Sequence, residues 1–157
     1  YETRFFPELE YTFKHAVTQD VIYQSLLAKR RKGLHGAIGR AIEDLHANRR
    51  EHAPILAYHY ARSEQPDKAI EYTLLAGDQA AHLYANAEAT TYYEQALTMA
   101  RGLPPSPPAH CAEIDAALKL AAVGMTRQHI ERDQRNVERG RTLGEQIQDE
   151  GRLAQAL

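Results

Sequence analysis

The sequence has almost no cysteine, and it has no long apolar run. Its 157 residues include one cysteine, Cys111, and no tryptophan. A single thiol excludes an internal disulfide and a cysteine-based metal site. No apolar run reaches the roughly 18 residues that a membrane-spanning helix needs, and no signal-peptide pattern opens the chain. We therefore expect a cytoplasmic protein without a membrane partner.

An excess of positive charge is missing as well. Nineteen basic side chains stand against 21 acidic ones, which gives a formal net charge of −2. A nucleic-acid-binding domain is normally clearly basic, so we expect no nucleic-acid partner. What is present, 43% hydrophobic and 25% charged residues, is typical of a globular domain. Because the chain begins with Tyr1 rather than methionine, we interpret it as part of a longer protein.

Alanine-rich segments with apolar residues at helical spacing predict an all-α fold. We expect helices over about 18–28, 30–47, 51–63, 67–85, 87–101, 109–124 and 130–147, and another beginning near 151. In the second helix the apolar stripe consists of Leu34, Ile38, Ala41, Ile42 and Leu45. These lengths and spacings predict an array of seven or eight helices.

Two segments depart from the helical pattern. Residues 10–14 alternate β-branched and aromatic side chains, which predicts one short strand with no pairing partner in the chain. The segment 104–108 holds four prolines in five residues and predicts a stiff, extended loop between helices.

A spacing of small and aromatic residues indicates an internal repeat. Its best copy covers residues 70–103 and matches the 34-residue tetratricopeptide repeat (TPR) through Ala76, Gly77, Ala80, Ala89, Tyr93 and Ala96. An overlapping register contains Leu56, Ala57, Tyr60, Ala69 and Ala76, and a weaker third contains Leu120, Ala121, Gly124, Val137 and Gly140. Stacked helical hairpins of this kind form a right-handed superhelix whose concave face binds a peptide or another protein. The alternative is an unrelated bundle with alanine-rich seams.

The sequence offers little that would carry out a reaction. It has no G-x-x-x-x-G-K-[ST] loop for a nucleotide phosphate, and the G-x-x-G-x-x-G run at Gly33, Gly36 and Gly39 predicts close helix packing instead. We interpret the histidines as surface or capping residues, with no metal site, and four carboxylates as solvated: His46, His52, His59 and His82; Glu113, Asp115, Glu131 and Asp133. We therefore predict no catalytic residues.

One dense basic cluster has two interpretations. It consists of Lys29, Arg30, Arg31 and Lys32. Such a patch can bind a phosphate or an acidic partner surface. Alternatively, these cations lie at the end of the helix over 18–28 and complement the negative end of its dipole.

Beyond these patterns, the chain resembles a known family. The segments FPELEYTFKHAVTQDVIYQSLLAKRRKGLHGAIGRAIEDLHA and EHAPILAYHYARSEQPDKAIEYTLLAGDQAAHLYANAEATTYYEQAL look like the middle of bacterial adenylate/guanylate cyclase-type multidomain proteins. Those proteins join a cyclase or other output domain to an AAA/STAND-type ATPase module and a TPR tail. The resemblance implies a winged-helix remnant over 1–16, a linking helical pair over 17–50 and TPR-like repeats over 51–157, cut within a repeat.

The resemblance also implies a regulatory function. His15 resembles the winged-helix histidine that reaches the β-phosphate of a bound nucleotide in STAND ATPases, although Lys14 and Ala16 replace that family's methionine and aspartate. The segment itself would hold no cofactor, whereas the longer protein would bind ATP or ADP with Mg²⁺. Its expected partners are the ATPase module of the same chain, a peptide or protein on the repeats and, in some assemblies, further copies of itself. The alternative is an independent TPR adaptor, and an enzyme is the reading that the residues favour least.

Overall fold

The fold is all-α, as the sequence predicts. The computed structural model describes residues 2–4, 10–11, 16–123 and 130–147, in which seven helices follow one another along the chain. They are α1 (Ala16–Ser25), α2 (Ala28–Leu45), α3 (Ala53–Tyr60), α4 (Pro66–His82), α5 (Asn86–Arg101), α6 (Pro107–Val123) and α7 (Ile130–Ile147). The helix expected near residue 151 lies outside the described residues.

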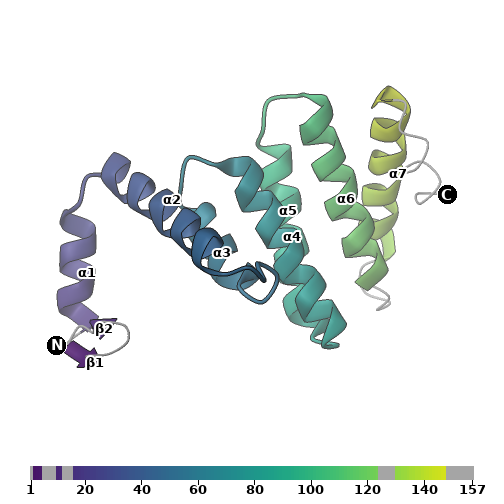
Figure 1. Cartoon of the computed structure of the whole chain (residues 1–157). Coiled ribbons are helices and arrows are strands. Elements are labelled where there is room, and N and C mark those ends of the chain that lie inside the picture. Colours follow the sequence, from purple (N-terminus) through teal and green to yellow (C-terminus); the bar gives the residue numbers. More distant parts are fainter. Residues whose placement is uncertain (1, 5–9, 12–15, 124–129, 148–157) are drawn as a thin grey trace.

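From α3 to α7, each helix packs against the next (Figure 1). α4 also contacts α6, so these two helices lie in one layer. α2 packs on α3 at the N-terminal end of this array, and α1 extends beyond it. The result is a row of helical hairpins with α1 and α2 at one edge.

The start of the chain forms a small ribbon. β1 (Glu2–Arg4) pairs antiparallel with β2 (Glu10–Tyr11), with Glu2 opposite Tyr11 and Arg4 opposite Glu10. The expectation that the strand has no partner within the chain is therefore wrong. Residues 12–14 of the segment expected to be a strand lie outside the described residues.

α4 is shorter at its C-terminal end than the sequence predicts. α4 ends at His82 because Tyr84 adopts a left-handed conformation, with φ of 58°. The amide of Ala85 then donates to the carbonyl of Ala80 at 2.9 Å, and the amide of Tyr84 donates to Ala81 at 3.0 Å, the two bonds of a Schellman motif. Glycine normally takes this position. Because the residue here is a tyrosine, the sequence gives no signal that the helix ends at His82.

The proline-rich segment corrects a second expectation. Pro107 and Pro108 form the first turn of α6 and are helical, whereas the prediction placed them in an extended loop. Proline is tolerated there because the first amides of a helix have no intrahelical partner. Ser106 caps the turn, since its hydroxyl accepts a hydrogen bond from the amide of Ala109 at 3.3 Å.

The core consists of two clusters joined through α4. One lies between α3 and α4, where the rings of Tyr60 and Tyr72 stack with centroids 5.5 Å apart. The other spans α4, α5 and α6 and is built on alanines and Tyr93. The Tyr93 ring lies so close to Gly77 that no Cβ fits at that position.

Candidate functional site

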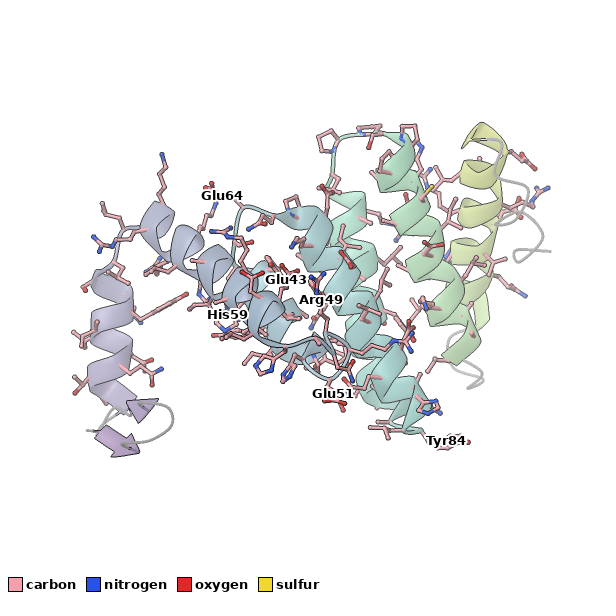
Figure 2. All side chains as sticks on the ribbon, in the orientation of Figure 1. Glu43, Arg49, Glu51, His59, Glu64 and Tyr84 are labelled. Carbon is pink, nitrogen blue, oxygen red and sulfur yellow. The ribbon has the colours of Figure 1, made fainter. Side chains whose placement is uncertain are left out.

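A hollow of about 440 Å³ lies between α4 and the loop that precedes α3. Leu75, Asp78, Gln79 and His82 line it from α4, at the i, i+3, i+4 and i+7 spacing of one helix face. The loop contributes Arg50 and Glu51. Figure 2 shows Glu51 beside this part of α4. The hollow therefore combines an apolar floor with side chains of both charges.

Hydrogen bonds hold the acidic groups of this hollow in place. Asp78 accepts a hydrogen bond from the hydroxyl of Tyr93 at 2.9 Å and pairs with the ammonium group of Lys119 at 2.5 Å. Burial, and then the hydrogen bond to Asp78, raise the pKa of Tyr93. Glu51 accepts from the amide nitrogen of Asn48 at 2.7 Å. Asp78 thus joins α4, α5 and α6 while it lines the hollow.

Gln79 carries an unused acceptor. Its Oε1 atom is buried and, among the described residues, makes no hydrogen bond. A buried amide oxygen without a donor destabilises the folded state by about 1–3 kcal/mol. A ligand with an N–H group, such as a peptide backbone or a basic side chain, would supply the missing donor once the Gln79 side chain turns into the hollow. The hollow is therefore suited to binding a polar chain.

A second polar cluster joins α2 to α3 and α4. The Glu43 carboxylate is buried, and it accepts hydrogen bonds from Lys68 Nζ at 2.5 and 2.7 Å and from the hydroxyl of Tyr72 at 2.6 Å. Burial alone would raise the pKa of Glu43, but the hydrogen bonds from Lys68, Tyr72 and Tyr60 outweigh it and lower the pKa. Glu43, which Figure 2 labels beside α2, is thus an ionised anchor between helices.

The third cluster holds two histidines where α1, α2 and α3 meet. The Nδ1 atoms of His35 and His59 lie 3.0 Å apart, and the Nε2 atom of His35 lies 2.9 Å from the hydroxyl of Tyr23. Burial, and then the charge of Arg62, lower the pKa of His35. Burial, the His35 ring and Arg62 lower the pKa of His59 in the same way. These histidines are therefore held neutral.

The structure places the predicted repeat residues together in the interior. All ten are buried: Leu56, Ala57, Tyr60, Ala69, Ala76, Gly77, Ala80, Ala89, Tyr93 and Ala96. The close packing predicted for the glycine run is confirmed at two of its three positions. A Cβ on Gly39 would lie 2.7 Å from Tyr60 Cζ and one on Gly36 2.9 Å from Gln65 Nε2, whereas nothing lies within 4 Å at Gly33.

One residue of the basic cluster contacts the end of α1, and the side chains of the other three are exposed. Arg31 Nη1 donates to the carbonyls of Tyr23 and Gln24 at 3.4 and 3.5 Å, at the C-terminal end of α1, as the dipole interpretation predicts. The other three side chains are exposed and make no hydrogen bond or ion pair with the rest of the described chain; they belong to Lys29, Arg30 and Lys32. His15 lies outside the described residues.

Several expectations about polar side chains are wrong. Glu113 is not solvated: it is buried and accepts from Arg101 Nε at 2.9 Å and Arg139 Nε at 3.2 Å. His59 is not a surface or capping residue, because it pairs with His35, which spacing arguments missed. The interpretation is confirmed for His46 and His52, which are the C-cap of α2 and the N-cap of α3 and stack with ring centroids 3.9 Å apart. Gln79 and Glu43 were also missed, and no sequence pattern distinguishes them from neighbouring polar residues.

The described residues contain no grouping of three or more histidine, cysteine, aspartate or glutamate side chains that could hold a metal ion. Within the same ranges, no helix is both long enough and apolar enough to cross a bilayer. A comparison of the chain with protein-family models, with curated proteins and with solved structures finds no match.

Proposed function

We propose that this chain is a non-catalytic, TPR-like segment that recognises a polypeptide on the α4 face. The hollow lined by α4 carries the proposal, because the buried Oε1 atom of Gln79 offers an acceptor without a donor. Leu75 supplies apolar contact, while Arg50 and Glu51 offer one charge of each sign. The stacking of α3 to α7 and the buried seam of small residues support a TPR-like superhelix as the scaffold.

The regulatory part of the proposal rests on the resemblance to multidomain signalling ATPases and nucleotide cyclases. In such a protein this segment would couple the nucleotide state of an ATPase module to partner recognition, and His15 would sense ATP or ADP bound with Mg²⁺. The alternative is an independent adaptor that uses the same α4 face. The two proposals differ in whether an ATPase module belongs to the same polypeptide.

Selection of a displayed random-peptide library on the purified chain, followed by calorimetric titration of an enriched peptide, tests the binding site. We expect Gln79→Leu to weaken that peptide by about tenfold, equivalent to about 1.4 kcal/mol. Thermal stability should not fall, because the variant removes an acceptor that is unpaired in the free protein. Gln95→Leu changes an exposed glutamine of α5 and is the matched control.

Two results would contradict the proposal. One is a library that yields no binder for the folded chain. The other is a peptide whose affinity Gln79→Leu and Gln95→Leu change equally, since the hollow would then contribute nothing particular to binding.

A further inference from the structure

The apolar stripe of α2 faces solvent. The sequence places Leu34, Ile38 and Leu45 on one apolar stripe, and their exposed fractions are 45%, 42% and 78%. The residues of α2 that pack inward are instead His35, Gly36, Gly39 and Glu43. Leu27, which precedes the first turn, is 80% exposed. A helix of 18 residues therefore leaves its most apolar stripe uncovered by the described residues.

The spacing of this stripe is that of a coiled coil. Positions 27, 31, 34, 38, 41 and 45 alternate steps of four and three residues, which is the a/d pattern of a heptad. Leu27, Leu34 and Ala41 take the d positions, and Arg31, Ile38 and Leu45 take the a positions. Stripes of this kind pack against a second helix by inserting each side chain between four others. The stripe on α2 therefore has the spacing of one half of a helix pair.

The charges beside the stripe identify the other half. Arg30 and Asp44 occupy g positions on the same flank of α2. Both side chains are exposed, and neither makes a hydrogen bond or ion pair within the described chain. In an antiparallel pair, g positions face each other across the seam. Positions 30 and 44 are equally far from Ala37, so a twofold axis at Ala37 brings Arg30 of each copy to Asp44 of the other. The flank of α2 that carries Arg30 and Asp44 is therefore complementary in charge to the same flank of a second copy.

The apolar layers are centred one residue away, at position 36. Ile38 of one copy packs against Leu34 of the other, and Leu45 packs against Leu27 at each end. Arg31 meets the small side chain of Ala41, which leaves room for its stem while its guanidinium group stays at the end of α1. A parallel pair would instead place the exposed Lys29, Arg30 and Lys32 of both copies side by side. Charge and packing thus favour the antiparallel arrangement.

We propose that α2 is the seam of a homodimer, in which two copies of the chain pair antiparallel through Leu27, Leu34, Ile38 and Leu45 and exchange Arg30–Asp44 ion pairs. This surface is distinct from the hollow on α4, so the dimer presents two binding faces. α2 is about 27 Å long, and an interface of that length lies at the small end of the range for stable complexes. We therefore expect association in the micromolar range.

Sedimentation velocity over low to high micromolar concentrations tests the dimer. The wild-type chain should shift from monomer to dimer, and Ile38→Asp should remain monomeric with an unchanged circular dichroism spectrum. Ile55→Asp is the control, because Ile55 is similarly exposed but lies on α3 outside the stripe. A wild-type chain that stays monomeric throughout overturns the proposal, as does a dimer that Ile38→Asp and Ile55→Asp weaken equally.

Charge exchange tests the orientation independently of the apolar layers. Arg30→Asp and Asp44→Arg should each weaken the dimer several-fold, because each places like charges opposite one another. The double variant restores the pairing and should recover most of the wild-type affinity. Arg40→Asp changes a cation on another face of α2 and should have little effect. A double variant no tighter than the single variants contradicts the antiparallel register.

Discussion

The two ends of α4 are joined to their neighbours by different chemistry. At its N-terminal end, Lys68 and Tyr72 bind the buried carboxylate of Glu43 on α2. Toward its C-terminal end, Gly77 and Ala80 pack directly against α5. The first joint depends on a few directional hydrogen bonds, and the second depends on close contact between small residues and one aromatic ring.

This difference determines how each joint tolerates change. A seam of small residues is close-packed and has no room for additional atoms. A polar joint specifies which groups must meet, but it buries little apolar area. That is why α2 can be fixed to the array while its apolar stripe still faces solvent. The alanine seam therefore contributes most of the packing, and the polar joint sets the position of α2.

Overfilling the alanine seam should have the largest effect. Ala89 is completely buried between α4 and α5, and Ala89→Leu should reduce the free energy of unfolding by about 1–3 kcal/mol. Ala87→Leu is the matched control, because Ala87 is exposed on the same helix and leucine suits a helix well. Urea denaturation followed by circular dichroism measures both. If Ala89→Leu and Ala87→Leu have the same free energy of unfolding, the contact between α4 and α5 accommodates a larger side chain without loss of stability.

The helices and the alanine seam were predictable because their signal is periodic. Small residues recur at the spacing of a closely packed helix face, so Ala76, Ala89 and Ala96 could be placed in the interior from sequence. Two helix ends were less predictable. The left-handed Tyr84 stops α4 without a glycine, and Pro107 begins a helix where proline content suggested a loop.

The orientation of α2 and the polar clusters could not be predicted, because both depend on distant residues. His35 meets His59 across 24 positions, and Glu43 meets Lys68 across 25. Periodicity correctly identified Leu34, Ile38 and Leu45 as one stripe. It does not reveal whether a stripe faces the protein's own core or solvent, so the orientation of α2 could not be predicted from it.

Neutralising the anchor of the polar joint should have a smaller effect. Glu43→Gln keeps an acceptor for Tyr72 but removes the charge that Lys68 binds, so we expect a loss of about 1–2 kcal/mol. The loss is limited because the Lys68 side chain is 37% exposed and can turn to water. Glu71→Gln removes an exposed carboxylate from α4 and should change the free energy of unfolding by less than about 0.5 kcal/mol. An unchanged Glu43→Gln variant would show that the polar joint adds no stability.

The smallest expected effect is a dependence of stability on pH. It arises from His35 and His59, where α1 meets α2 and α3. The Nδ1 atoms of His35 and His59 share one hydrogen bond, so one ring donates and the other accepts. Arg62 lies near both rings, and no carboxylate contributes to the shift of either pKa. Tyr23, Tyr58 and the cations add no negative charge that would favour imidazolium. Protonating both rings is therefore incompatible with this contact.

The sign of the pH dependence follows from the lowered pKa values of both histidines. Below about pH 6.5 the unfolded chain binds protons that the folded chain excludes, so stability falls as pH falls through this range. The melting temperature should therefore decrease from about pH 8 to about pH 5.5, a window above that in which Glu43, with its lowered pKa, is protonated. Replacing both His35 and His59 with Asn should reduce this slope, even if the variant melts lower at every pH. The Ala87→Leu variant retains both histidines and should keep the wild-type slope. If the melting temperature of the double variant falls with acid as steeply as that of the wild type, the His35–His59 pair does not cause the pH dependence of stability.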